Sequence, residues 1–152
     1  MSHAMYRFLE LTVGRYMTRR LETVRCATTL GELEVLFRRH DFNAFPVTAE
    51  GLMVGLVSKF DFLKAFAFTT AQLVPHYNEL MRKTVQEVMT KQVVSVERNT
   101  PLTRVLHMMV ELRSRSFPVV GPSAELVGMI AREDIMRALQ DATKEPTSKS
   151  SA

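Results

Sequence analysis

Val54-Gly55-Leu56-Val57-Ser58-Lys59-Phe60-Asp61 is the stretch that decides the fold, and it occurs twice. It returns 73 residues later as Val127-Gly128-Met129-Ile130-Ala131-Arg132-Glu133-Asp134. In each copy a short apolar run is typical of a buried strand, and the polar residues after it suit the start of a helix. The stretch therefore predicts, twice in one chain, a strand that passes directly into a helix.

The repetition extends toward the N-terminus of each copy. Phe45-Pro46-Val47 matches Phe117-Pro118-Val119, and Val13-Gly14-Arg15-Tyr16-Met17-Thr18 matches Val85-Gln86-Glu87-Val88-Met89-Thr90, in both cases 72 residues apart. Matches in one order at a nearly fixed spacing indicate an internal duplication. The expected organisation is an N-terminal segment (1–12), a first repeat (13–66), a helical insert (67–84), a second repeat (85–140) and a disordered tail (141–152).

Each copy has the pattern β-α-β-β-α. The expected strands are 21–24, 45–48 and 54–57 in the first copy, and 93–96, 117–120 and 127–130 in the second. A unit this small cannot bury both faces of its sheet alone. The sequence therefore predicts an α/β fold in which the two repeats pack against each other.

Two helices are expected in each copy. In the first copy Thr29 has capping-box spacing to Glu32, and in the second Thr100 precedes Pro101, a favoured first helical residue. The second helix of each copy should begin near residue 59 or 132. A further helix is expected at 77–81 in the insert, after a break at Pro75.

Composition excludes several classes of protein. The 152 residues are 46% hydrophobic and 24% charged, with a net charge of +4, and no apolar run approaches the length of a membrane span. Cys26 is the only cysteine, which fits a reducing, cytoplasmic setting. The four histidines show no paired ligand spacing, so no metal site is expected, and no catalytic motif occurs, so no enzyme activity is expected.

The polar end of the repeated stretch carries the chemistry. The N-terminus of a helix presents unpaired N–H groups that suit an anion such as phosphate. Ser58 can add a hydrogen bond and Lys59 a charge, while the carboxylate of Asp61 can hold two vicinal hydroxyls of a ribose. The alternative is that Ser58 and Asp61 only form a capping box. In the second copy the acid remains while Ala131 replaces the hydroxyl, which points to a separate task for the carboxylate.

Taken together, these motifs resemble the CBS domain (cystathionine-β-synthase-type domain), and two copies in tandem resemble the arrangement called a Bateman module. The resemblance covers about Val13 to Gln140. It implies two sheets packed about a pseudo-twofold axis with two clefts, no required cofactor, and a regulatory ligand such as AMP, ADP, ATP or S-adenosylmethionine.

The resemblance also implies a set of binding residues. Asp61 and Asp134 would hold ribose hydroxyls, and Ser58, Lys59 and Arg132 would face phosphate. The segments that line the clefts would contribute Thr18, Leu21, Glu22, Asn43, Ala44, Thr90, Val93, Val94, Arg115 and Ser116. Because Ala131 departs from the Ser or Thr of the family, the site with Asp61 should bind phosphate more tightly than the site with Asp134.

Three functions remain open from the sequence. The first is a regulatory module that binds an adenosyl ligand and acts on a protein not yet identified. The second is a ligand-free interaction module. The third is nucleic-acid binding, which the basic balance and Arg104, Arg113 and Arg115 suggest, although no stacking motif of interleaved aromatic and basic residues supports it. The second helices also carry apolar residues beyond the need of one sheet face, which predicts a homodimer. These are Phe62, Leu63, Phe66, Ile135, Met136 and Leu139, with Leu73, Tyr77 and Leu80 in the insert.

Overall fold

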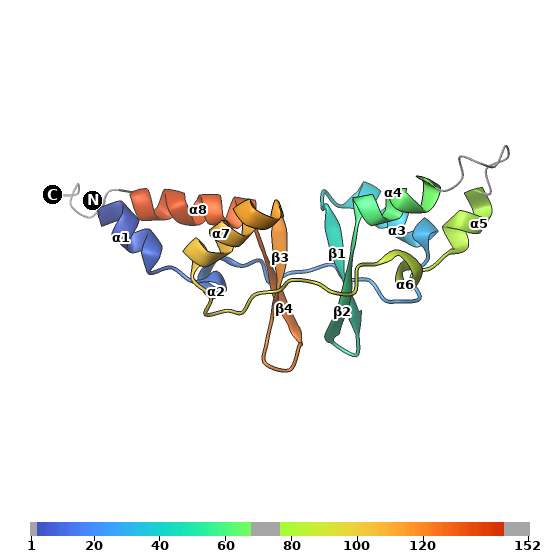
Figure 1. The fold of residues 1–152 in the computed structure, drawn as a ribbon, viewed down its shortest axis with the longest axis horizontal. Helices are drawn as coiled ribbons and strands as arrows, with labels where there is room; N and C mark the ends of the chain where they lie inside the picture. Colours follow the sequence, from blue (N-terminus) through green and yellow to red (C-terminus); the bar gives the residue numbers. More distant parts are fainter. Residues whose placement is uncertain (1–2, 68–76, 145–152) are drawn as a thin grey trace. The chain divides into compact units, whose positions relative to one another are not determined.

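A computed structural model of the protein describes residues 3–67 and 77–144 (Figure 1). In chain order the elements are α1 (His3–Leu9), α2 (Val13–Tyr16), α3 (Leu30–Arg39), β1 (Ala44–Ala49), β2 (Leu52–Ser58), α4 (Lys59–Ala67), α5 (Tyr77–Arg82), α6 (Val85–Val88), α7 (Leu102–Leu112), β3 (Ser116–Val120), β4 (Leu126–Ala131) and α8 (Arg132–Thr143). Within the described residues, no helix has both the length and the apolar character needed to cross a membrane. The break expected at Pro75 and most of the tail lie outside the described residues.

The chain divides into two compact units whose limits differ from those of the sequence repeats. One unit is residues 22–93, here called the central unit, and the other combines 1–21 with 94–152, here called the terminal unit. Residues 13–21, which begin the first repeat, therefore pack with the strands of the second repeat. Residues 85–93, which begin the second repeat, pack with the strands of the first.

Each unit is built on one antiparallel hairpin, β1–β2 or β3–β4. Phe45 lies opposite Val57 in the first hairpin, and Phe117 lies opposite Ile130 in the second. These four side chains are buried in the cores of their units, because alternate residues of a strand point to the same face. The mixed fold with small antiparallel sheets is therefore confirmed, as are the two strands predicted for each hairpin.

The strand expected to begin each repeat is much shorter than predicted. Val24 forms a single parallel bridge to Val47, and Val96 forms the same bridge to Val119. The Val24 N–H donates to the Pro46 carbonyl and its own carbonyl accepts from the Thr48 N–H, both at 3.0 Å. The prediction of 21–24 and 93–96 as strands was wrong, because each segment contributes only one residue to the edge of its hairpin.

The helix starts agree with the sequence at all but one position. Helix α3 begins after Thr29, whose hydroxyl accepts from the Glu32 N–H at 3.1 Å, while Glu32 accepts from the Thr29 N–H at 2.9 Å. Helix α7 begins at Leu102, one residue later than expected. The Leu102 N–H donates to the Leu11 carbonyl at 3.0 Å, and Pro101 stays extended with ψ of 142°. Pairing with the N-terminal segment thus delays the helix by one residue.

Helix α1, which the sequence did not predict, completes the core of the terminal unit. It lies beside α8 (Figure 1). Its Phe8 is buried with Val13, Met17 and the side chains of β3, β4 and α8. Arg7 donates through Nε to the Ala142 carbonyl at 2.8 Å, which satisfies a free carbonyl at the end of α8. The N-terminal segment is therefore part of the folded unit.

The presence of a Met-Thr pair and a glycine in both repeats has a packing cause. The Thr18 N–H donates to the Met129 carbonyl of β4 at 2.8 Å, and the Thr90 N–H donates to the Leu56 carbonyl of β2 at 2.8 Å. A Cβ at Gly128 would lie 2.8 Å from the Thr18 carbonyl oxygen, and a Cβ at Gly55 would lie 2.8 Å from the Met89 sulfur. Each glycine therefore lets a Met-Thr segment cross directly over the strand.

Replacing either glycine by alanine should destabilise the unit that contains it. We expect Gly128→Ala to lower the free energy of unfolding by about 1–3 kcal/mol, because the added methyl meets backbone that must move. Gly55→Ala should cost less, because the atom nearest to the new methyl belongs to the flexible Met89 side chain. Urea denaturation measures both, with Gly31→Ala as the control, since its nearest contact is 3.4 Å away. Equal stability of Gly128→Ala and the parent would contradict the close approach.

Two capping glutamates make the stability depend on pH. The backbone N–H of Thr29 lowers the pKa of Glu32 below its ordinary 4.5, and the N–H of Thr84 does the same for Glu87. A lowered pKa in the folded state means that the charged form stabilises the fold. The contribution is complete above pH 4.5 and is lost as the pH falls through the lower folded-state pKa.

We therefore expect acid to lower the melting temperature of the parent more steeply than that of a Glu32→Gln/Glu87→Gln double variant. Glutamine can still accept the capping hydrogen bond but does not titrate. Melting curves recorded between about pH 6 and about pH 3 test this linkage. Parallel curves for the two proteins would show that the caps do not contribute to the acid response.

Candidate functional site

Two aspartates stand out because they are the buried charged side chains among the described residues. Asp61 and Asp134 are each 4% exposed, and each is the third residue of its helix, α4 or α8. Strands β2 and β4 end where these helices begin, so each carboxylate is held at a strand–helix junction. The two sites lie in different units, Asp61 in the central unit and Asp134 in the terminal unit.

Asp61 binds groups from three directions. Its Oδ2 accepts from the Ser58 N–H at 2.9 Å and from the Thr90 hydroxyl at 3.4 Å, and its Oδ1 lies 3.1 Å from the Lys64 ammonium. The Ser58 hydroxyl in turn accepts from the Asp61 N–H at 3.0 Å. The capping box considered from the sequence is therefore present, and the Ser58 O–H hydrogen is still available to a ligand.

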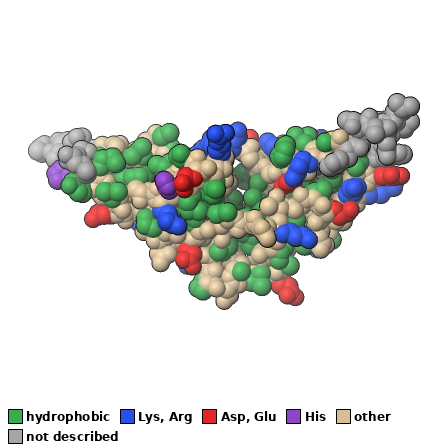
Figure 2. Space-filling model, in the orientation of Figure 1, with side chains coloured by type: hydrophobic (Ala, Val, Ile, Leu, Met, Phe, Trp, Pro, Cys, Tyr) green, Lys and Arg blue, Asp and Glu red, His purple; other side chains and the backbone are tan. Residues whose placement is uncertain are grey.

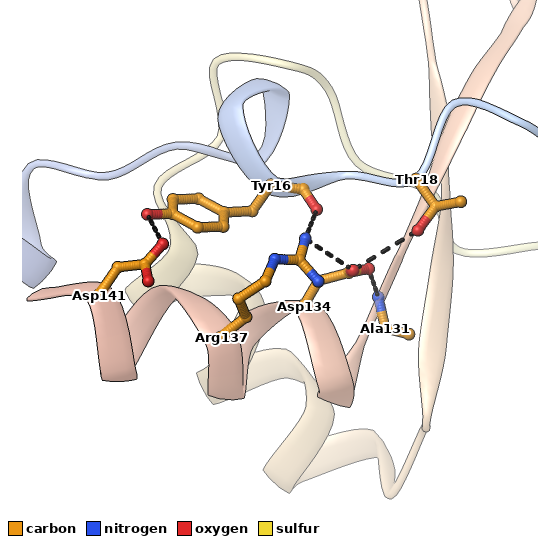
Figure 3. A network of polar contacts seen from close by, with 6 residues as sticks. All are labelled: Tyr16, Thr18, Ala131, Asp134, Arg137 and Asp141. Atoms are coloured by element: carbon orange, nitrogen blue, oxygen red, sulfur yellow. Dashed lines mark hydrogen bonds and ion pairs between the residues drawn. The ribbon is translucent and has the colours of Figure 1, made fainter.

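Asp134 has the matching set of partners (Figure 3). Its Oδ2 accepts from the Ala131 N–H at 2.9 Å, and its Oδ1 lies 3.5 Å from the Thr18 hydroxyl and 3.2 Å from the Arg137 guanidinium. The backbone half of a capping box thus persists although Ala131 has no hydroxyl. Asp134 therefore still caps α8 without that hydroxyl. The presence of an acid together with Ala131 is thus weaker evidence that the carboxylate has a role other than capping.

Of the other residues expected at the sites, Thr18 and Thr90 lie beside the carboxylates with exchanged partners. Thr18 belongs by sequence to the first repeat but contacts Asp134 of the second, and Thr90 of the second repeat contacts Asp61 of the first. The crossing of the Met-Thr segments over Gly128 and Gly55 places them there. Each carboxylate cluster therefore combines residues from both repeats within one compact unit.

Residues before the Pro-Val pairs also reach the helix starts. The Lys59 N–H donates to the Asn43 carbonyl at 2.9 Å, and the Arg132 N–H donates to the Arg115 carbonyl at 3.0 Å. In the strand register Ala44 pairs with Ser58, and Ser116 pairs with Ala131. These pairs bring the expected residues of each repeat to one strand–helix junction, where the side chains of Lys59 and Arg132 are exposed.

The residues expected from the first strands lie at the limits of the two compact units. Leu21 and Glu22 flank one boundary between the compact units, and Val93 and Val94 flank the other. Glu22 lies 3.8 Å from the His40 ring nitrogen, within the central unit. No hydrogen bond or ion pair joins these four residues to Asp61 or Asp134 in the described part of the chain, so their role at a ligand site stays a prediction.

Two residues at the clusters were missed from the sequence, Lys64 and Arg137. They occupy equivalent places in the two repeats, three residues after Asp61 and Asp134. A cation three residues after an acid lies on the same side of a helix, so these two contacts could have been predicted from the sequence. No group of three metal-binding side chains occurs in the described parts of the chain.

The hydrogen-bonding capacity of each carboxylate is not fully used by its partners among the described residues. A carboxylate offers about four acceptor positions, and three donors are found at each of these two aspartates. The threonine contacts are long, and the cations come from half-exposed side chains. Any further hydrogen-bond donor that reached either carboxylate would compete with these weaker donors, while the backbone N–H would keep the carboxylate in place.

Comparison with known proteins gives the family. The CBS domain matches residues 13–68 and 85–141. The chain is 31% identical over 149 residues to the CBS domain-containing protein CBSX1, chloroplastic, of Arabidopsis thaliana, which covers 84% of this chain and 63% of that protein. The chain thus spans less than two thirds of this relative's length.

Two solved structures are similar over most of their length. CBSX2 in complex with AMP has a TM-score of 0.76 and 26% identity, covering 88% of this chain and 98% of that one. The CBS domain pair of protein MJ0100, in complex with 5′-methylthioadenosine and S-adenosyl-L-methionine, has a TM-score of 0.69 and 25% identity, covering 84% and 98%. With two matched segments and two equivalent aspartate clusters, the chain belongs to the CBS-domain family and carries two CBS domains.

Proposed function

We propose that the protein is a non-enzymatic regulatory module that binds an adenosyl ligand at Asp61 and, more weakly, at Asp134. The observation that carries this proposal is the pair of buried carboxylates, each held by a backbone N–H and a threonine hydroxyl at the start of a helix. A buried carboxylate in this setting is suited to accept two hydrogen bonds from a ribose diol.

The ligands of the two similar structures share a ribose rather than a phosphate. AMP contains a phosphate, whereas 5′-methylthioadenosine and S-adenosyl-L-methionine do not, and all three contain adenine joined to a ribose with free 2′- and 3′-hydroxyls. In this chain the aspartate is likewise present in both repeats, while the hydroxyl at Ser58 becomes Ala131. The aspartate is thus common to both sites of this chain, and the ribose is common to all three ligands. This favours the ribose as the part that Asp61 and Asp134 recognise.

Calorimetry with AMP and 2′-deoxy-AMP tests this function. We expect AMP to bind and the deoxy analogue to bind about 10- to 100-fold more weakly, because one hydrogen bond to a charged acceptor is lost. GMP serves as the control for the base. S-adenosylmethionine and 5′-methylthioadenosine, titrated in parallel, show whether phosphate contributes to affinity. Equal affinity for AMP and 2′-deoxy-AMP, or no binding of any adenosyl compound, would contradict the proposal.

We further propose that two copies of the chain associate through the outer faces of α4 and α8. Phe62 and Ile135, two of the apolar residues noted from the sequence, pack into the cores, and Leu80 is also buried. In contrast, Leu63 and the equivalent Met136 are 59% and 58% exposed. Apolar side chains reach the visible surface of both units (Figure 2). Exposed apolar side chains at matching positions in both repeats favour a symmetric interface.

Light scattering on the parent and on a Leu63→Glu/Met136→Glu variant measures this association. We expect about twice the chain mass of 17.3 kDa for the parent and the single-chain mass for the variant. Both substituted positions are exposed, so the variant should keep its fold, which circular dichroism verifies. A parent mass near 17.3 kDa would rule out the homodimer.

A further inference from the structure

The two carboxylates differ in how firmly a cation is attached to them. Lys64 lies 3.1 Å from Asp61, and Arg137 lies 3.2 Å from Asp134, each one helical turn after the acid. The two cations are about equally exposed, at 49% and 52%. Their direct contacts with the carboxylates are therefore similar, and any difference arises from their other partners.

Arg137 has a second and a third attachment, both to Tyr16 (Figure 3). Its Nη2 donates to the Tyr16 carbonyl at 2.9 Å, and its guanidinium carbon lies 5.6 Å from the centre of the Tyr16 ring. Tyr16 is itself fixed, because its hydroxyl donates to Asp141 of α8 at 2.9 Å. Burial and this hydrogen bond raise the pKa of Tyr16, so the hydroxyl stays protonated and keeps donating at neutral pH.

Lys64 lacks the tyrosine. Val88 stands where the terminal unit has Tyr16, and it offers neither a ring nor a hydroxyl. The Lys64 ammonium lies 5.4 Å from the ring centre of Phe60, which is itself 68% exposed. A contact between two exposed, unanchored side chains contributes little, whereas a planar guanidinium with several fixed partners is preorganised.

We propose that Arg137, anchored by Tyr16, is a built-in competitor for the Asp134 carboxylate and makes the Asp134 site fill after the Asp61 site. This inference rests on the proposed function. A ribose diol needs acceptor positions on both carboxylate oxygens, and the guanidinium occupies Oδ1. At Asp134 the ligand must displace a cation with three attachments, while at Asp61 it displaces a lysine whose contacts among the described residues are the carboxylate and an exposed ring.

The test isolates the Asp134 site in an Asp61→Asn background and uses adenosine, which has no phosphate for Arg137 to attract. We expect Arg137→Met to raise the affinity for adenosine about 3- to 10-fold, because a half-exposed charge contact no longer competes. We expect the same variant to lower the melting temperature, because its bonds to Tyr16 and Asp134 are lost. If Arg137 had only a structural role, Arg137→Met would lower both the affinity for adenosine and the melting temperature. Tyr16→Val, which introduces the residue type found at the equivalent position Val88, should also raise the affinity for adenosine.

The matched control is Lys64→Met in an Asp134→Asn background, where the rise in adenosine affinity should be smaller. Unchanged or weaker binding in both Arg137→Met and Tyr16→Val would overturn the inference, and so would an equal rise in Lys64→Met. The parent protein is titrated alongside to separate the two ideas. If the parent binds adenosine at Asp61 but the Arg137 series does not respond, only the inference fails. If the parent binds no adenosine, the proposed function fails as well.

Discussion

An Asp61→Asn variant is expected to bind AMP about 10- to 100-fold more weakly than the parent, because charge-assisted hydrogen bonds to the ribose are lost. Asparagine has nearly the same shape, and its amide oxygen can still accept from the Ser58 N–H. The start of α4 should therefore persist, and the loss should be in affinity more than in stability. Calorimetry gives the affinity, and thermal unfolding without ligand gives the stability.

The control for Asp61→Asn is Ser58→Ala, which gives the central unit the residue of the terminal unit. It removes the hydroxyl that accepts from the Asp61 N–H but keeps the carboxylate. We expect it to weaken AMP binding less than Asp61→Asn does, and to leave adenosine binding nearly unchanged. If Asp61→Asn bound AMP as tightly as the parent, Asp61 would be a helix cap and nothing more.

Much of the fold was readable because local patterns and tertiary packing agree. The short apolar runs Phe45–Val47 and Val54–Val57 predict two strands, which pair as a hairpin, and the capping box at Thr29 gives the start of α3. The strand–helix junctions at Asp61 and Asp134 were predicted for the same reason. Helix α1 was missed because its contribution, the burial of Phe8 against the terminal unit, depends on residues far away in the sequence.

The exchange of the Met-Thr segments could not be read from the sequence. Thr18 and Thr90 are the same residue type in the same context, so each would suit the aspartate of either repeat. A symmetric pattern cannot distinguish the two pairings, and only the path of the chain between units decides between them. The path of the chain also explains why the first strand of each repeat is short. The chain passes from one unit to the other at residues 21–22 and 93–94, within the predicted strands.

Substitutions at Val13 and Val85 should reveal the exchange directly. These residues are equivalent in the repeats, and both are fully buried, Val13 in the core of the terminal unit and Val85 in that of the central unit. An aspartate at either position would place an unpaired charge in a core, at a cost of several kcal/mol, which is comparable to the stability of a small domain. Hydrogen exchange then reports which hairpin loses protection.

We expect Val13→Asp to expose the amides of β3 and β4, in the second repeat, while β1 and β2 of its own repeat keep their protection. Val85→Asp should have the opposite effect. The milder variants Val13→Ala and Val85→Ala should each speed amide exchange in the same hairpin as the corresponding aspartate variant. Complete unfolding is not expected, because each leaves only a small cavity. If Val13→Asp instead released β1 and β2, the N-terminal segment would pack with its own repeat. Thr18 would then lie at Asp61, and the competition between Arg137 and a ligand for Asp134 would have no anchor in Tyr16.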